Sequence, residues 1–346
     1  MSNRPLHQRF AQLAEKLPHV ALAKLPTPTT LLDLNGTPLL AKLDGETSAL
    51  YGGNKVRKLE YLLAQAQSHG CTRVATFGAA GSNHATATAV HAHAQGLRCT
   101  TFLSRQRATP WIADNLWRQL NVDTDIVYVD GARAQREHQA REWIKKCDER
   151  VWRIPMGGSS LAGALGYVNA GLEFAHQLEN SALPDRLYVP LGTMGTAVGL
   201  AIGLKLAGLP IPLHAIRVVH KTIGSAALAP RFFDCISRLL TTLAPSIPRL
   251  TFNATEFVVR EEFFGAGYAQ ATDGAIAAVM LAREKWGLPL ETTYSGKTLA
   301  AVLADQRCVD APKRPALWCT YSGHQTEPKR PADQLARLPQ SLHPYI

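Results

Sequence analysis

Residues 51–58, Tyr-Gly-Gly-Asn-Lys-Val-Arg-Lys, form the most unusual local pattern of the chain and begin its first long predicted helix. Gly52-Gly53 predicts a turn, and Asn54 predicts a helix N-cap. Three cations then fall in the first helical turn, where the helix dipole disfavours each exposed positive charge by roughly 0.3–1 kcal/mol. Such conflict with local rules is typical of functional sites. We therefore expect an anionic group nearby.

Lys55 is the residue of this turn that we expect to perform chemistry. A lysine beside a positive helix end and a second cation loses proton affinity, and a Schiff-base amine must lose its proton. The alternative is a solvated surface lysine, which is the usual state of this residue type. The Gly-Gly-Asn turn and the charge conflict raise the functional interpretation to about equal weight.

Strand and helix patterns alternate along the rest of the chain, which predicts an α/β fold with two open, mostly parallel sheets and flanking helices. Residues 29–44 predict a hairpin around Asn35-Gly36. The expected helices are 54–69, 82–95, 110–119, 133–147, 163–179, 195–207, 224–241, 273–286 and 297–305, and the later strands are 73–78, 99–104, 125–130, 186–192, 214–219, 256–262 and 316–322. The polar, Pro-rich end of the chain predicts a segment that wraps over the surface.

A second polar group follows a predicted strand and its small residues. Ser82 and Asn83 place a hydroxyl and an amide at a helix start, which suits a carboxylate or a ring oxygen. The same pair is also an ordinary helix cap. His91 and His93 lie two residues apart on one helix and do not share a face, so we expect no metal there.

Residues 192–196, Gly-Thr-Met-Gly-Thr, open another helix directly after a strand. The glycine spacing differs from a Walker loop and from the GxGxxG dinucleotide fingerprint. Backbone N–H groups, two threonine hydroxyls and a positive helix end still converge there, which suits a phosphate. Tight helix-on-strand packing through glycines is an equally weighted alternative. Together with Lys55 and the Ser82-Asn83 pair, this loop indicates a phosphorylated aldehyde cofactor.

Composition excludes several classes of protein. The 346 residues suit two α/β lobes, and 46% hydrophobic residues suit a globular chain. The net charge of +10 is scattered, without zinc-finger spacing or a long basic run, so we expect no nucleic-acid partner. Six dispersed cysteines favour a reducing, cytoplasmic location. The most apolar stretch, residues 199–216, contains a lysine and two prolines, so we expect no membrane segment.

Seven segments form an ordered set: LPTPTTLL (25–32), GGNKVRKLEYLL (52–63), GSNHA (81–85), PMGGSSLAGALGYVNAGLE (155–173), GTMGTAVG (192–199), GYA (267–269) and TTYSGK (292–297). They resemble the D-cysteine desulfhydrase and 1-aminocyclopropane-1-carboxylate (ACC) deaminase family, within the tryptophan-synthase-β-like, fold type II pyridoxal-phosphate (PLP) enzymes. The resemblance covers about residues 20–325. It implies pyridoxal 5′-phosphate as cofactor, a small amino acid as substrate and a homodimer. It also implies a large PLP-binding domain (1–54 and 163–346) with a small α/β domain (55–162) inserted in it.

The resemblance further implies a role for each matching residue. Lys55 would hold the cofactor aldehyde and transfer protons, Ser82 would meet the substrate carboxylate, and Tyr268 and Tyr294 would contact the substrate and assist its chemistry. The other cofactor contacts would be Asn83 at the ring hydroxyl, Gly192, Thr193, Met194, Gly195 and Thr196 at the phosphate, and Ser322 at the pyridine nitrogen. An uncharged partner at that nitrogen moderates the electron sink and favours elimination.

The resemblance favours β-elimination from a small β-substituted amino acid, with D-cysteine first, giving pyruvate, ammonia and sulfide. Relatives that open the cyclopropane ring carry a glutamate where this chain has Ser295, so ring-opening deamination is the second hypothesis. A non-catalytic protein that binds PLP or an amino acid is the third. The chain departs from the family pattern at Leu43–Gly45, Ala269–Ala271 and Gly323-His324, on the substrate side. A nicotinamide dehydrogenase would need the GxGxxG loop that is missing here.

Overall fold

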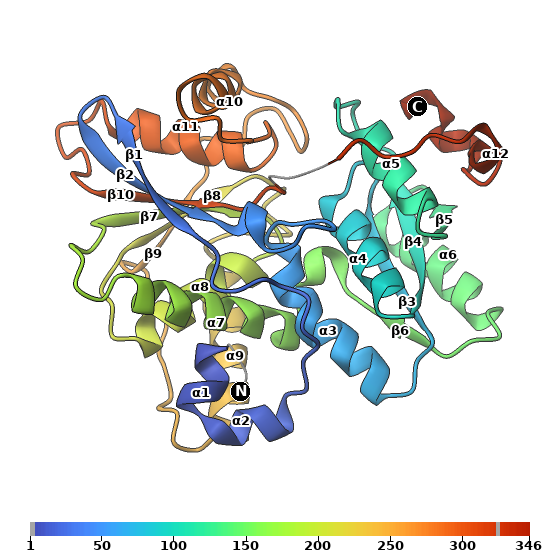
Figure 1. Cartoon of the computed structure of the whole chain (residues 1–346), viewed down its shortest axis with the longest axis horizontal. Coiled ribbons are helices and arrows are strands. Elements are labelled where there is room, and N and C mark those ends of the chain that lie inside the picture. Colours follow the sequence, from blue (N-terminus) through green and yellow to red (C-terminus); the bar gives the residue numbers. More distant parts are fainter. Residues whose placement is uncertain (1–3, 323–325) are drawn as a thin grey trace.

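Two sheets with flanking helices form the frame of the computed structural model, which describes residues 4–322 and 326–346 (Figure 1). The large sheet has the strand order β1-β2-β10-β7-β8-β9, and the small sheet has the order β5-β4-β3-β6. All neighbouring strands are parallel except β1 and β2. The predicted fold class is confirmed. The strands are β1 (Thr29–Leu34), β2 (Thr37–Leu43), β3 (Arg73–Ala79), β4 (Arg98–Ser104), β5 (Asp125–Tyr128), β6 (Val151–Arg153), β7 (Arg186–Leu191), β8 (Leu213–Arg217), β9 (Phe257–Arg260) and β10 (Pro315–Cys319).

Helices cover both faces of the large sheet, with α10 and α11 on one side and α7, α8 and α9 on the other (Figure 1). The α-helices are α1 (Pro5–Arg9), α2 (Ala11–Lys16), α3 (Lys55–Ser68), α4 (Asn83–Ala94), α5 (Ile112–Leu120), α6 (Arg133–Lys145), α7 (Leu161–Gln177), α8 (Gly195–Leu206), α9 (Ala229–Leu243), α10 (Asp273–Trp286), α11 (Ser295–Asp305) and α12 (Ala332–Leu335). Short 3₁₀ helices lie at Asp44–Glu46, Met156–Gly158 and Gln340–Tyr345.

The predicted hairpin is present and begins the large sheet. Leu34 pairs with Thr37, and the two turn residues between them have positive φ angles of 52° at Asn35 and 89° at Gly36. These angles match the twist of a two-residue hairpin turn, which explains why Asn-Gly stands there.

Most predicted elements match the observed ones to within a few residues, but the short helices α1, α2 and α12 and one strand were not expected, and one helix begins later. β6 has three residues and was not expected, because its extended shape depends on pairing with β3 rather than on a local pattern. α9 begins at Ala229 rather than at 224, with Pro230 in its first turn. Proline lacks the N–H group that a helix interior would use, so it suits a helix start.

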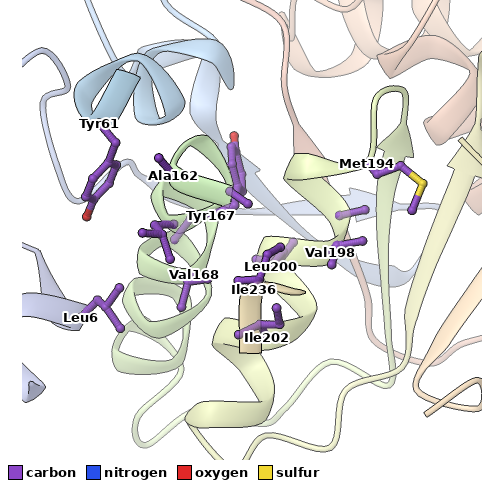
Figure 2. Packing of buried hydrophobic residues seen from close by; sticks show 14 of the residues in the cluster. Leu6, Tyr61, Ala162, Tyr167, Val168, Met194, Val198, Leu200, Ile202 and Ile236 are labelled. Carbon is purple, nitrogen blue, oxygen red and sulfur yellow. The ribbon is translucent and has the colours of Figure 1, made fainter. Parts of the chain in front are cut away.

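The main apolar core lies between α7, α8 and α9 (Figure 2). Val168 of α7, Leu200 and Ile202 of α8, and Ile236 of α9 are fully buried. Each such side chain contributes roughly 1.5–3 kcal/mol by leaving water. This packing gives α8 a rigid position, with Met194 at its start (Figure 2).

Glycine contacts bring α3 against this core. A Cβ atom on Gly166 of α7 would lie 2.1 Å from the carbonyl oxygen of Arg57, so only glycine allows the approach. The contact places the first turn of α3, which begins at Lys55, at the junction of the two sheets (Figure 1).

The C-terminal segment, residues 326–346, follows the surface as predicted and lies beside α5 (Figure 1). Leu338 and Leu342 are buried in a cluster with Ile112 and Leu116 of α5. The family resemblance implied that the large domain holds both chain ends, whereas this segment packs on the small-sheet side. The division into 1–54 and 163–346 against 55–162 stays a proposal.

Candidate active site

The Lys55 amine lies in a polar environment at the start of α3. Its Nζ donates to Asn54 Oδ1 at 2.9 Å and lies 5.9 Å from the centroid of the Tyr294 ring. Burial lowers the pKa of Lys55 to about 8, and the negative charge of Glu291 opposes this shift. The reduced proton affinity expected from the sequence is therefore present, but its main cause is burial rather than the neighbouring cations.

The anionic partners expected near the cationic turn belong to Arg57. The Arg57 guanidinium lies 2.8 Å from Asp44 Oδ1 and 2.8 Å from Glu173 Oε1, and Lys42 also pairs with Glu173. All four side chains are buried. Burial acts to raise the pKa of Asp44, but the charge and hydrogen bonds of Arg57, the Lys42 charge and the Tyr167 hydrogen bond together hold that pKa below its usual value. Arg57 therefore has a structural role.

The N-cap prediction for Asn54 was wrong. Asn54 has a helical conformation and its side chain makes no capping hydrogen bond. Instead, its Nδ2 donates to Thr196 Oγ1 at 3.0 Å, while its Oδ1 accepts from Lys55. Asn54 thus connects the lysine turn to the 192–196 loop, a contact between distant segments that local propensity does not reveal.

The 192–196 loop has the geometry of an anion cradle at the start of α8. Met194 has a φ of 71°, a left-handed conformation that is uncommon for a residue with a side chain. Gly195 N donates to Ser159 Oγ at 3.1 Å, and that hydroxyl also bonds Thr193 Oγ1 at 2.7 Å. Gly192, the first residue of this loop, faces Tyr294, because a Cβ atom on Gly192 would lie 3.5 Å from the Tyr294 ring.

Lys58 is a buried cation beside this cradle, and the sequence analysis assigned it no role. Its Nζ donates to Gly157 O at 3.1 Å and Ser159 Oγ at 3.3 Å, and it forms no ion pair with any described residue. Burial, followed by the Lys55 charge, lowers the pKa of Lys58 well below its usual value. A buried cation without a counter-ion is costly. A bound phosphate at the positive end of α8 would neutralise it, so the residues fit a phosphorylated cofactor.

The signal that could have identified Lys58 is its spacing. Lys55 and Lys58 lie three residues apart on one helix and therefore share a face. Ser159 carried no comparable signal, because its contacts with Lys58, Thr193 and Gly195 join distant segments.

Ser82 and Asn83 lie at the start of α4. Ser82 is its N-cap, with Oγ accepting from Ala85 N at 3.2 Å, so the capping interpretation is correct and its hydroxyl proton can still be donated. Asn83 Oδ1 accepts from Tyr51 OH at 3.1 Å and from Asn115 Nδ2 at 3.0 Å. Because both bonds use the Asn83 carbonyl oxygen, they fix the orientation of the amide, and its NH₂ group can donate to a ligand.

Tyr268 and Tyr294 meet at the side of Lys55. Their hydroxyl oxygens are 2.9 Å apart, and their rings pack edge to face with centroids 6.1 Å apart. Burial raises the pKa of both hydroxyls, so both are neutral donors near neutral pH. Ala269 beside them has a φ of 57°, so it keeps a backbone shape that glycine adopts more easily.

Glu291 holds the segment that carries Tyr294. Its buried carboxylate accepts from the backbone N–H groups of Thr293, Tyr294 and Ser295 at 2.7, 2.8 and 2.9 Å. The Ser295 hydroxyl is also turned to this residue and accepts from Glu291 N at 2.9 Å. Ser295 stands where ring-opening relatives carry a glutamate, and in this chain it helps to fix the start of α11.

Ser322 lies against the lysine turn, where its Oγ accepts from Gly52 N at 3.0 Å. This contact ties the end of the large sheet to the Gly52-Gly53 turn. Ser322 thus joins the site by contact, while its role at a pyridine nitrogen remains a prediction. The Gly323-His324 departure lies outside the described residues.

Residues 4–322 and 326–346 contain neither a metal-ligand cluster nor a membrane-spanning helix. No group of three or more His, Cys, Asp or Glu side chains in these ranges could hold a metal ion, and none of their helices is long and apolar enough to cross a bilayer. His91 is buried with its ring bonded to Tyr51 O at 2.9 Å, whereas His93 is exposed. The two histidines therefore face different environments.

Comparison with known proteins agrees with this chemistry. A family model described as pyridoxal-phosphate dependent enzyme matches residues 20–318. The chain belongs to this family. As a PLP-dependent enzyme, it has PLP as its cofactor, and it falls in the D-cysteine desulfhydrase and ACC deaminase group of fold type II enzymes.

Two curated relatives and one solved structure show how similar this PLP enzyme is to known members. It is 29% identical over 298 residues to D-cysteine desulfhydrase of Klebsiella pneumoniae subsp. pneumoniae, covering 83% of the chain and 88% of the relative. It is 32% identical over 296 residues to nocardicin C-9′ epimerase of Nocardia uniformis subsp. tsuyamanensis, covering 84% and 88%. It superposes on an ACC deaminase homologue with a TM-score of 0.77 at 25% identity, covering 98% of the chain and 100% of the homologue.

Proposed function

We propose that this PLP enzyme catalyses β-elimination from a small β-substituted amino acid of the D-cysteine type, giving pyruvate, ammonia and sulfide, with Lys55 as the cofactor-binding amine. The observation that carries the proposal is the position of the Lys55 amine, which is partly buried and lies 5.9 Å from the Tyr294 ring centroid. The 29% identical desulfhydrase supports the choice of reaction. When bound, PLP supplies an electron sink for charge that develops at the α-carbon of the amino acid.

Phosphate binding in this proposal uses groups that already converge. The hydroxyls of Thr193 and Thr196, the Lys58 amine and the start of α8 would contact the phosphate, with Met194 and Gly192 shaping the loop. The Gly195 N–H, which donates to Ser159 Oγ, would turn to the phosphate when it binds. Asn83 would donate its amide to the ring oxygen, because Tyr51 and Asn115 occupy its carbonyl oxygen.

Substrate handling would use two further groups. Ser82 and the free N–H groups at the start of α4 would bind the carboxylate, since a helix N-terminus attracts anions. With a pKa of about 8, Lys55 exchanges a proton near neutral pH and would remove the α-proton as a general base. The neutral Tyr268 and Tyr294 hydroxyls, 2.9 Å apart, would donate a proton towards the leaving group.

The 32% identical epimerase supports a second candidate, which is inversion at an α-carbon. Elimination and epimerisation both begin with removal of a proton next to a carboxylate, and they differ in whether a leaving group then departs. Ring opening has less support, because Ser295 is turned to Glu291 and supplies no carboxylate. A protein that binds PLP or an amino acid without turnover remains the non-catalytic alternative.

The test is incubation of the PLP-loaded enzyme in deuterated water with D- and L-cysteine, D- and L-alanine, and ACC. We expect pyruvate and sulfide in a 1:1 ratio from one cysteine enantiomer. Deuterated, inverted alanine without pyruvate from cysteine would favour epimerisation, and 2-oxobutanoate from ACC would favour ring opening. An amino acid that changes the cofactor absorbance with no product would favour the non-catalytic alternative.

We also propose a homodimer in the cytoplasm, on the basis of the family resemblance and the unpaired cysteines among the described residues. Sedimentation of the purified protein tests the dimer directly. A monomer at micromolar concentration would contradict the proposed homodimer.

A further inference from the structure

Gln106, in the loop after β4, contacts the loop that precedes Ser82. Gly81 N donates to Gln106 Oε1 at 3.0 Å. A Cβ atom on Gly81 would lie 3.1 Å from Gln106 Nε2, so the glutamine side chain packs directly on this glycine. The backbone just before Ser82 is therefore held by a side chain from a neighbouring strand end.

Gln106 is in turn held by the C-terminal segment. Gln106 N donates to Tyr345 OH at 2.9 Å, and the Tyr345 hydroxyl donates to Gln106 O. Tyr345 is fixed because Leu338 and Leu342 of the same segment are buried against α5. The next-to-last residue of the chain thus determines where the Gln106 backbone lies.

The opposite side of the same loop is held from α5. Asn115 Nδ2 donates to Gly81 O at 3.1 Å and to Asn83 Oδ1 at 3.0 Å. Because the C-terminal segment covers α5, it supports the Gly81–Asn83 loop by two routes, one through Gln106 and one through Asn115. The first route passes through the mostly exposed loop after β4 and depends on two hydrogen bonds between Tyr345 and Gln106 and one between Gln106 and Gly81.

We propose that Gln106 is a positioning residue for the substrate carboxylate, and that Tyr345 holds Gln106 in place. This inference rests on the proposed carboxylate role of Ser82. Loss of the Gly81–Gln106 bond, or of the Gln106–Tyr345 bonds, would let the Gly81-Ser82 backbone shift and would weaken amino-acid binding. The cofactor contacts of Lys55 and the 192–196 loop would stay intact. The C-terminal segment is then part of the substrate site.

The test compares Tyr345→Phe and Gln106→Leu with the control Arg337→Gln. Tyr345→Phe keeps the ring and removes both bonds to Gln106. Arg337→Gln removes an exposed ion pair with Asp123 from the same segment without touching Gln106. Two quantities are measured on the PLP-loaded proteins: amide hydrogen exchange of the peptide containing Gly81, and the dissociation constant of D- or L-alanine from the cofactor absorbance.

We expect at least tenfold faster exchange at Gly81 and at least threefold weaker alanine binding in the two variants, with the control unchanged and cofactor content equal in all proteins. Unchanged exchange would overturn the link through Gln106, and faster exchange with unchanged alanine affinity would overturn its role in substrate binding. If neither alanine binds the unmodified enzyme, the carboxylate role of Ser82 fails and this inference fails with it. Failure of the elimination proposal is seen separately, when alanine binds but no cysteine is converted.

Discussion

The Lys55 amine lies 5.9 Å from the centroid of the Tyr294 ring, and the Tyr294 hydroxyl is 2.9 Å from that of Tyr268. This relationship joins the start of α3 to the start of α11 and puts a neutral hydroxyl pair beside the amine. Tyr294→Phe keeps the ring over Lys55 but removes the hydroxyl. We expect kcat to fall by about 100-fold, at the low end for loss of a general acid, with cofactor binding unchanged. Unchanged kcat in steady-state assays would assign Tyr294 to packing alone.

Glu291 supplies the negative charge that raises the pKa of Lys55 against the effect of burial. Glu291→Gln removes that charge, so we expect the Lys55 pKa to fall below about 8. The acid limb of the kcat profile, which reports the enzyme–substrate complex where the Lys55 amine would act as general base, should then move to lower pH. Glu284→Gln, at an exposed position of α10, is the matched control. A shift to higher pH, or the same shift in the control, would contradict this electrostatic role.

Asp44 holds the buried ionic network behind the lysine turn. Asp44→Asn removes one carboxylate and leaves the Arg57 charge partly uncompensated, and breaking a buried pair typically costs about 3–5 kcal/mol. Asp33→Asn removes an exposed pair with Lys285, which water screens, and should cost much less. Urea unfolding of both variants measures the difference. Equal losses would show that the buried network does not stabilise the fold.

His7 makes stability depend on pH. Burial, followed by the positive charges of His19 and Arg4, lowers its pKa to about 4, while the unfolded chain titrates near 6.5. The unfolded state therefore binds the proton first as pH falls, and stability is lost from about pH 6.5 down to about 4. Between pH 7 and pH 5 we expect a loss of about 2 kcal/mol from this group.

His7→Gln should flatten that part of the pH dependence of the unfolding free energy. The control is His69→Gln, at the exposed C-cap of α3, which should leave the slope unchanged. An identical slope in His7→Gln and the unmodified protein would show that other groups cause the loss.

Features with a local cause were predictable from the sequence. Asn35-Gly36 gave the hairpin because its positive φ angles are a property of those two residues. The 192–196 loop and Lys55 were identifiable because glycines, hydroxyls and charge are concentrated in short segments. The family motifs added the two tyrosines, which the structure brings together.

Features that depend on distant contacts were not predictable in this way. The Asn54 side chain bonds Thr196 instead of capping its own helix, and Lys58 acquires its position from Ser159 and Gly157. No local pattern marked Glu291, and its electrostatic effect on Lys55 arises between segments that are distant in the sequence. Such pairings appear only when the two sheets are assembled.

The identity of the cofactor-binding amine is tested most directly by reduction of the PLP-loaded protein with sodium borohydride, followed by peptide sequencing in a mass spectrometer. Cleavage after glutamate keeps Lys55 and Lys58 on one peptide, residues 47–60, and fragment ions distinguish them. We expect the pyridoxyl group on Lys55, with Lys58 unmodified because its amine bonds Gly157 and Ser159 instead. A pyridoxyl group on Lys58, or on a lysine outside this turn, would contradict the assignment of Lys55 and the mechanism built on it.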